Sequence, residues 1–124
     1  MSMNQEVKAK WLTALRSGEY QQGRYALNES GTFCCLGVLC DLYSKETNTP
    51  WTDGHACLLT KIMLGFDTVL PDKVKDWAGL DSHDPKLVEE NPDYENGKHE
   101  EYVSCLNDSG RTFLQIADLI EAQL

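Results

Sequence analysis

The sequence has no long apolar run, no apolar leader and no excess of positive charge, and each absence excludes a class of protein. No window approaches the ~20 consecutive apolar residues of a membrane-spanning helix. The first residues, MSMNQEVKAKW, are polar and lack the apolar segment of a secretory signal. Twenty acidic side chains outnumber 11 basic ones, and the net charge of −9 argues against binding to bare nucleic acid or an anionic membrane.

Cofactor and metal motifs are also missing. The sequence contains neither G-x-G-x-x-G nor G-x-x-x-x-G-K-[ST], the common phosphate-binding signatures. Zinc sites usually show two C-x₂₋₄-C pairs or an H-x₃₋₅-H pair, and the five cysteines and three histidines supply neither. The acidic segment DSHDPKLVEE lacks the central glycine of a calcium loop. We therefore expect no cofactor and no metal.

The remaining composition is that of one ordinary globular domain. The chain has 124 residues, of which 41% are hydrophobic and 25% charged, so one domain over residues 1–124 is expected. The odd number of cysteines favours reduced thiols in a cytoplasm over a disulfide scaffold. Cys34, Cys35 and Cys40 lie within one apolar run, which predicts that they pack in the core.

Periodicity and turn residues predict an α+β domain, with four or five helices packed around a small antiparallel sheet or hairpin. The expected helices span residues 4–17, 35–45, 71–79, 100–108 and 111–124, the last with Thr112 and Gln115 spaced as a capping box. Short segments at 24–27 and 32–35, joined by turn residues, predict the hairpin. Gly37 indicates close packing within the second helix, and the apolar stretch 55–64 fits neither helix nor strand by its period.

Residues 81–101 differ from the rest of the chain in charge. They carry eight acidic side chains against Lys86 and Lys98, so this stretch alone holds −6 of the total charge of −9. Two prolines and an Asn-Gly pair interrupt it. The segment is therefore expected to be a solvated, mobile loop.

Two kinds of chemistry fit residues elsewhere in the chain. Cys34 or Cys35 could act as a nucleophile at a helix start, with His55 as its base, although both cysteines are also what a packed core requires. Alternatively, the first 25 residues carry a net charge of +2, with Tyr20, Gln22 and Arg24 clustered near a glycine. Arginines and aromatic rings in this arrangement suit a small nucleotide.

Four sequence blocks resemble an uncharacterised family of small phage and prophage proteins. They are W-x-x-A-L-R-S-G-x-Y-x-Q-G at 11–23, C-C-L-G-V-L-C-D-L at 34–42, L-P-x-x-V-x-x-W-A-G-L at 70–80 and L-N-D-x-G-x-[ST]-F-x-x-I-A-D-x-I-E at 106–121. The resemblance implies a phage accessory protein in the cytoplasm of an infected bacterium. Such proteins often counter host defences, by sequestering nucleotide immune signals or by binding defence proteins. Two departures stand out: Tyr25 occupies a position where glycine is common, and the acidic insert from Glu89 to Glu101 is longer than usual.

The resulting hypothesis is a non-enzymatic phage protein that binds and sequesters a small nucleotide-type immune signal. In this hypothesis the arginines hold phosphates, Tyr20 or Trp51 stacks on a base, and Gln22 and His55 give specificity. The candidate ligand-binding residues are Arg16, Tyr20, Gln22, Arg24, Trp51, His55 and Arg111.

Two alternatives stay open. The acidic segment from Glu89 to Glu101 could bind a basic surface of a host defence protein and inhibit it. The chain could also be a small cysteine-dependent hydrolase. The expected partners are a small nucleotide-type ligand or a host protein, with neither bare nucleic acid nor membrane, and a homo-oligomer is left open because a chain of this size has little room for a deep pocket.

Overall fold

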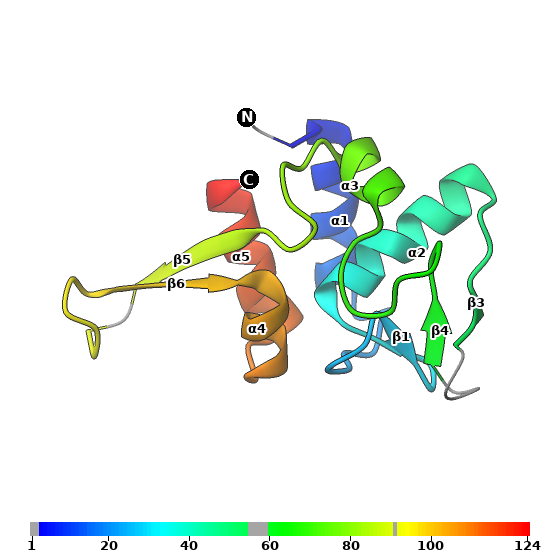
Figure 1. Cartoon of the computed structure of the whole chain (residues 1–124). Helices are drawn as coiled ribbons and strands as arrows, with labels where there is room; N and C mark the ends of the chain where they lie inside the picture. The colour runs from blue at the N-terminus through cyan, green and yellow to red at the C-terminus, as the bar shows by residue number, and fades with distance from the viewer. Residues whose placement is uncertain (1–2, 55–59, 91) are drawn as a thin grey trace.

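The computed structural model describes residues 3–54, 60–90 and 92–124 (Figure 1). This part of the chain contains five helices and six short strands. The helices are α1 (Gln5–Ser17), α2 (Cys35–Thr47), α3 (Asp72–Ala78), α4 (Val103–Asp108) and α5 (Phe113–Gln123). The strands are β1 (Asn28–Glu29), β2 (Thr32–Phe33), β3 (Thr52–Asp53), β4 (Thr60–Ile62), β5 (Lys86–Glu90) and β6 (Lys98–Tyr102). The predicted α+β class is confirmed.

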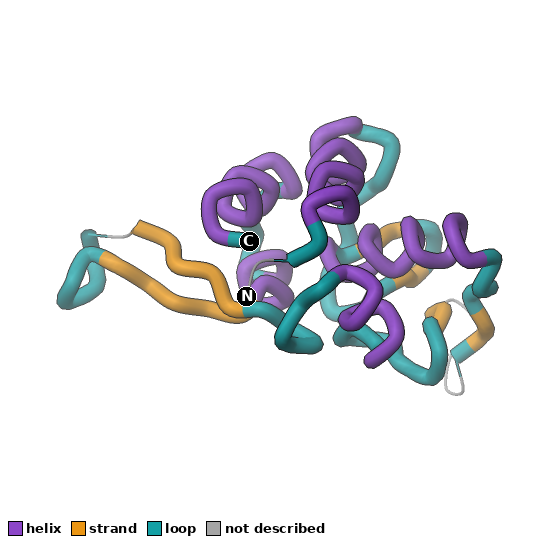
Figure 2. The backbone as a smooth tube through the Cα atoms, turned by 90° about the horizontal axis from the view of Figure 1, so that it is seen from above, coloured by secondary structure: helices purple, strands orange, loops and turns teal. Residues whose placement is uncertain are grey.

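The helices form the body of the molecule, with α2 in contact with α1, α3 and α4, while α5 packs along α1. A four-stranded antiparallel sheet, in the order β2-β1-β4-β3, lies below α2 in the view of Figure 1. The β5–β6 hairpin is a separate two-stranded sheet and projects from the helices in both views (Figures 1 and 2). Among the described residues, no helix is long and apolar enough to cross a membrane.

Helix α1 forms where the sequence pattern predicts it. The side chain of Asn4 caps its first turn by accepting hydrogen bonds from the backbone N–H groups of Glu6 (2.9 Å) and Val7 (3.1 Å). Gly18, with φ of 78°, ends the helix in the left-handed conformation that glycine adopts without strain. The buried face includes Trp11, whose indole N–H donates to the carbonyl of Cys35 at 2.9 Å. This bond fixes α1 against the start of α2.

Helix α2 is the most buried helix, and its glycine has a packing role. Gly37 lies so close to the backbone of Leu27 that a Cβ atom there would fall 1.7 Å from the Leu27 carbonyl oxygen. The close packing predicted at Gly37 is therefore confirmed. The apolar run of α2 is buried in the core. The residues that are fully inaccessible to solvent are Cys35, Leu36, Val38, Leu39 and Cys40.

The first hairpin exists, but its strands are shorter and its turn is shifted from the prediction. Residues 28–29 pair with 32–33 across a two-residue turn, in which Ser30 and Gly31 have φ of 53° and 82°. Positive φ at both central positions is the geometry of a tight hairpin turn, so Asn28 and Glu29 belong to a strand. Residues 24–27 are irregular instead, and Tyr25 has φ of 68°. The left-handed backbone there explains why glycine suits this position.

The expectation of a solvated loop over residues 81–101 is wrong in part, because this stretch contains most of the β5–β6 hairpin. The five residue pairs of the hairpin run from Lys86↔Tyr102 to Glu90↔Lys98. Leu87 is completely buried and anchors the base of the hairpin against the core. Tertiary contacts of this kind stabilise strands whose own residues have low strand propensity.

The two closing helices agree with the prediction except at one boundary. Helix α4 begins at Val103 rather than near residue 100. The predicted capping box at the start of α5 is present: the Thr112 side chain accepts from the Gln115 N–H at 3.2 Å, and the Gln115 side chain accepts from the Thr112 N–H at 2.9 Å. The apolar stripe of α5 is buried as predicted.

Candidate ligand-binding groove

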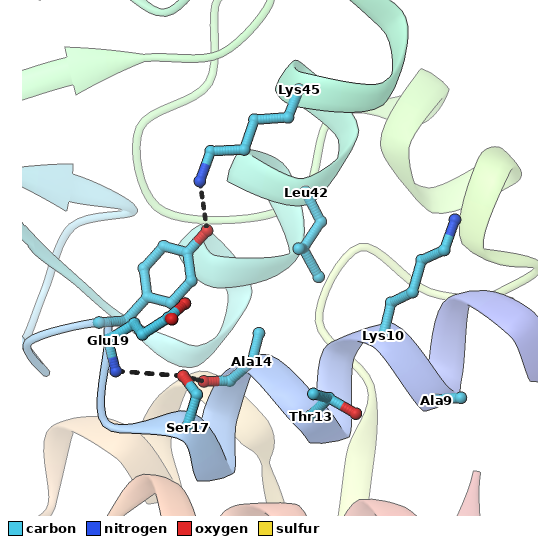
Figure 3. Close-up of a pocket in the computed structure, with 9 residues that line it drawn as sticks. Ala9, Lys10, Thr13, Ala14, Ser17, Glu19, Leu42 and Lys45 are labelled. Carbon is cyan, nitrogen blue, oxygen red and sulfur yellow. Dashed lines mark hydrogen bonds between the residues drawn. The ribbon is translucent and has the colours of Figure 1, made fainter.

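An open groove with a volume of about 470 Å³ lies between α1 and α2 (Figure 3). It is lined by Ala9, Lys10, Thr13, Ala14, Ser17, Glu19, Tyr20, Leu42 and Lys45. Most of the lining surface is apolar. Its volume falls within the range of about 300–1,000 Å³ that is usual for small-molecule sites.

The sequence of α1 leaves this space open. Ala9, Thr13 and Ser17 are spaced four residues apart, so they lie on one face of the helix. Their short side chains do not fill the gap to α2, whereas the apolar residues on the opposite side of α1 are buried in the core. This strip of α1 is therefore a shallow wall of the groove, whereas Trp11 packs against the start of α2.

Asp41 bonds the two residues at one end of the groove, Tyr20 and Lys45. Its side chain is only 13% exposed, and it accepts hydrogen bonds from the Tyr20 hydroxyl at 2.5 Å and the Trp51 indole N–H at 3.0 Å. Lys45 forms an ion pair with the same carboxylate at 3.1 Å. Burial alone would raise the pKa of Asp41, but these three donors outweigh it and hold the pKa below its ordinary value. The Asp41 carboxylate is therefore charged near neutral pH.

Tyr20 is held rigidly as one wall of the groove. In addition to its bond to Asp41, the hydroxyl accepts a hydrogen bond from Lys45 at 3.2 Å, and the Lys45 ammonium lies 5.4 Å from the ring centroid. Burial and the bond to Asp41 raise the pKa of the Tyr20 hydroxyl. The ring meets Phe33 edge to face at 5.2 Å, and Phe33 meets Trp51 at 6.2 Å. Phe33 thus lies against both of the aromatic rings that bond Asp41.

Two lysines reach into the groove from opposite helices. Lys10 extends from α1 to Glu46 of α2 at 3.0 Å, and Lys45 extends from α2 toward Tyr20 (Figure 3). Both are well exposed, at 52% and 70% of the side chain. Exposed ion pairs contribute only about 0–1 kcal/mol. The Lys10–Glu46 pair is exposed on both sides, so an anion in the groove can compete for the Lys10 ammonium at little cost. Lys45 pairs with the largely buried Asp41, so it would bind an anion through the N–H group that its bonds to Asp41 and Tyr20 leave over.

Of the candidate ligand residues predicted from the sequence, the structure brings Tyr20 and Trp51 together at Asp41. Arg16 instead forms ion pairs with Asp118 at 2.9 Å and Glu121 at 3.1 Å, which tie α1 to α5. Gln22 uses both ends of its amide inside the protein, donating to Asn107 and to the Arg111 carbonyl and accepting from the Phe113 N–H. Its observed contacts are structural.

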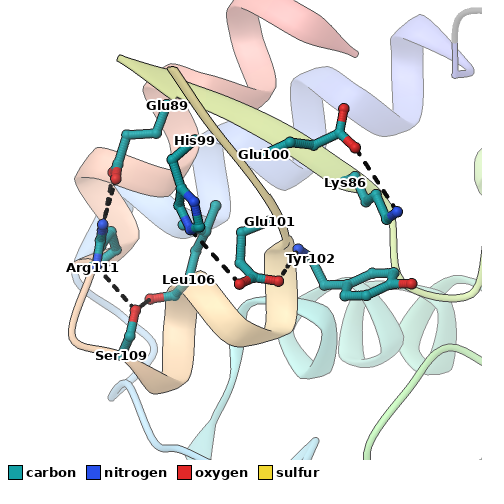
Figure 4. Close-up of polar contacts among 9 residues, drawn as sticks. All are labelled: Lys86, Glu89, His99, Glu100, Glu101, Tyr102, Leu106, Ser109 and Arg111. Atoms are coloured by element: carbon teal, nitrogen blue, oxygen red, sulfur yellow. Dashed lines mark hydrogen bonds and ion pairs between the residues drawn. The ribbon is translucent and has the colours of Figure 1, made fainter. Parts of the chain in front are cut away.

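The other candidates lie away from the groove or outside the described residues. Arg111 makes a two-pronged ion pair with Glu89, including a bond of 2.9 Å from its Nε atom, and also donates to Ser109 (Figure 4). Arg24 is exposed, with its guanidinium beside Gly110. His55 lies outside the described residues. A role for these residues in ligand binding stays a prediction.

Two residues that fix the Tyr20 side of the groove, Asp41 and Lys45, were not predicted from the sequence. Their spacing of four residues within the second predicted helix is the signal that could have identified an ion pair. The four-residue spacing of Ala9, Thr13 and Ser17 could likewise have identified an open helix face. Lys10 appeared in the sequence only as one of several basic residues near the N-terminus.

The three cysteines of the apolar run are packed as predicted. Cys34, Cys35 and Cys40 are buried, and the Cys34 sulfur caps α2 by accepting from the Gly37 N–H at 3.4 Å. Burial raises the pKa of Cys34 to about 11 and raises those of Cys35 and Cys40. The thiol, not the nucleophilic thiolate, is therefore the form present near neutral pH. This weighs against a cysteine-dependent hydrolase in the observed conformation.

These features define a small α+β protein with an aromatic- and lysine-lined groove between two helices. A family described as a domain of unknown function (DUF8296) matches residues 3–124, and the chain therefore belongs to that family. Neither a curated protein nor a solved structure matches the chain. The family membership agrees with the resemblance to an uncharacterised family and assigns no activity.

Proposed function

We propose that this chain is a binding protein that sequesters a small nucleotide-type ligand in the α1–α2 groove without chemically altering it. The observation that carries the proposal is the composition of the groove: an apolar surface with an aromatic wall, Tyr20, and an ammonium group from each of two helices. Nucleotides combine a planar apolar ring with phosphate anions, so they complement both features.

The geometry suggests which group each side chain would contact. Lys10 would exchange Glu46 for a phosphate oxygen, and Lys45 would add a phosphate oxygen to its bonds with Asp41 and Tyr20. The base would lie along the apolar surface of Ala14 and Leu42, against the ring of Tyr20. Because Asp41 and Phe33 already fix Tyr20, little conformational entropy would be lost on binding.

The biological role follows from the resemblance to phage proteins. We infer that the ligand is an immune signal of the infected bacterium, and that the protein acts in the cytoplasm as a counter-defence protein. Sequestration needs only tight binding and a sufficient copy number. The burial of Cys34, Cys35 and Cys40 is compatible with that role.

One mixing experiment tests the proposal. The purified protein is incubated with cyclic oligonucleotides, cyclic ADP-ribose isomers and common nucleotides, and the free ligands are quantified by mass spectrometry after filtration. The retained protein is then heated and the released compounds are identified. Depletion of a nucleotide that returns intact on heating supports sequestration. Altered products would indicate an enzyme, and depletion of none of these compounds would contradict the proposal.

A second candidate function rests on the β5–β6 hairpin. Over residues 86–90 and 92–102, six acidic side chains outnumber two lysines, and the hairpin projects away from the helical body (Figure 1). A projecting acidic element can reach a basic surface that the rest of the protein would not contact. As a second candidate, we infer that this acidic arm binds and inhibits a host protein. Charge reversal at Glu90 and Glu95 should then weaken such a complex.

A further inference from the structure

The two edges of the acidic arm, defined as the described residues 86–90 and 92–102, differ in how their backbone groups are used. On β5, the side chain of Gln123 accepts a hydrogen bond from the Val88 N–H and donates one to the Val88 carbonyl, each at 2.7 Å. The C-terminal helix thus occupies the outer edge of β5 in the manner of a short additional strand. On β6, no other segment among the described residues bonds the backbone of the outer edge in this way.

The hydrogen-bond pattern shows which groups of β6 face outward. In an antiparallel pair, residues that do not bond each other direct their N–H and C=O groups to the outer edges. Val88 bonds Gln123 on its outer side, so its partner Glu100 must face outward on β6. The same alternation turns Lys98 outward and His99 and Glu101 inward.

Two further bonds agree with this assignment. The Val103 N–H donates to the Pro85 carbonyl at 2.8 Å, as the alternation requires for the pair that precedes Lys86↔Tyr102. The outward N–H of Tyr102 donates to the side chain of Glu101 at 2.9 Å rather than to a neighbouring strand (Figure 4). In the described part of the chain, the outward backbone groups of Lys98 and Glu100 therefore have no neighbouring strand, and both residues are exposed.

Charge determines what kind of strand fits this edge. The arm carries six acidic residues and two lysines, so a second copy would bring another acidic arm against it. Charged side chains on an edge commonly prevent pairing between identical copies. The side chains of an incoming strand alternate between the two faces, so a basic residue on one face would lie near Glu100 and a basic residue on the other face near Glu101.

We propose that the outer edge of β6 binds an extended basic segment of another protein as an additional antiparallel strand. The N–H and C=O groups of Lys98 and Glu100 supply the backbone bonds, and Glu100 with Glu101 favours basic residues on the incoming strand. The inference rests on the second candidate function and names its mode of binding. It is independent of the α1–α2 groove.

Two peptides of identical sequence and charge separate backbone pairing from simple charge attraction. The probe is a peptide of about eight residues, the length of an ordinary strand, in which lysine alternates with threonine and valine. Its control carries N-methyl groups on the backbone nitrogens of one edge, so it keeps every charge but cannot pair through that edge. Binding is measured at about 0.05 M salt, where electrostatic attraction is weakly screened.

The proposal predicts binding of the unmodified peptide and about tenfold or more weaker binding of the methylated one. Amide hydrogen exchange should slow at Lys98 and Glu100, while the inward amides of His99 and Glu101 should not change. Equal binding of both peptides would overturn strand addition, but it would still support the acidic arm as a binding site for basic partners. Binding of neither would overturn the second candidate function as well.

A pair of variants provides the same test within the protein. Glu100→Pro and Glu100→Gln both remove one negative charge, but only proline removes the outward N–H. Proline is tolerated on an edge strand where the N–H faces solvent, so the hairpin should persist. We expect Glu100→Pro to weaken binding of the unmodified peptide about tenfold and Glu100→Gln about twofold. Equal effects of the two substitutions, with the hairpin intact by amide shifts, would contradict the proposal.

Discussion

The Tyr20 hydroxyl donates a hydrogen bond of 2.5 Å to the carboxylate of Asp41, which joins the loop after α1 to the middle of α2. Trp51 donates to the other oxygen of the same carboxylate, so three segments of the chain meet at one buried acid. The bond also sets the position of the Tyr20 ring along the groove. Stability and the shape of the candidate site are therefore coupled through Asp41.

Replacing Tyr20 by phenylalanine should destabilise the protein by about 1–2 kcal/mol, because it removes a hydrogen bond to a charged and largely buried group. Urea denaturation measures the change. Tyr25→Phe is the matched control, since the Tyr25 side chain is 72% exposed and its loss of a hydroxyl should change stability by less than about 0.5 kcal/mol. Equal effects of both substitutions would contradict the role of the Tyr20–Asp41 bond.

Asp41 predicts a specific dependence of stability on pH. Its pKa is lowered in the folded protein, so its charged form stabilises the fold above the ordinary pKa of about 3.9. This contribution is lost as the pH falls through the lowered pKa. Asp41→Asn should be less stable than wild type at pH 7, and the difference should shrink below about pH 4. A constant difference in the free energy of unfolding across this range would show that the charge of Asp41 is not responsible.

Tyr25 has a backbone conformation that costs free energy for any residue except glycine. Its φ of 68° lies in the left-handed region, and its side chain is 72% exposed. Tyr25→Gly should therefore preserve stability or raise it by up to about 1 kcal/mol. Gly31 has φ of 82°, in the same left-handed region, so Gly31→Ala should lower the free energy of unfolding. Thermal unfolding that shows a marked loss in Tyr25→Gly would indicate that the tyrosine ring itself stabilises the fold.

The cysteines offer a test of the hydrolase alternative. In the native protein, iodoacetamide should modify exposed Cys105 well before buried Cys34, Cys35 or Cys40. Burial raises the pKa of Cys34 to about 11, so its modification should stay slow at pH 8. Mass spectrometry of digested samples identifies the labelled sites over time. Rapid labelling of Cys34 would instead indicate a reactive thiolate and restore the nucleophile hypothesis.

Elements with strong local signals were predicted well. The periodic apolar stripe of α1 and the Thr112–Gln115 capping box each depend on residues within one or two turns of helix, and the structure confirms both. The β5–β6 hairpin was missed because its strands, KLVEE and KHEEY, lack a regular apolar alternation. Burial of Leu87 and the contact of Val88 with Gln123, 35 residues away, stabilise it instead.

In the candidate site, too, residue types were predictable from the sequence, whereas long-range contacts were not. The sequence identified Tyr20 and Trp51 by residue type, and the structure brings them together. Gln22 was also chosen by type, but its amide bonds Asn107 and Arg111, which lie 85 and 89 residues further along the chain. Local patterns do not contain such contacts. The groove itself depends on how α1 and α2 are spaced, which no single segment determines.

The most direct test of the central claim is the dissociation constant of a retained nucleotide for wild type and two charge-matched double variants. Lys10→Ala with Lys45→Ala removes both groove cations, while Lys73→Ala with Lys98→Ala removes two lysines outside it. The account predicts about tenfold or more weaker binding for the groove variant and less than about twofold for the control. Equal weakening in both variants, or weakening caused by Arg24→Ala instead, would contradict a ligand site in the α1–α2 groove.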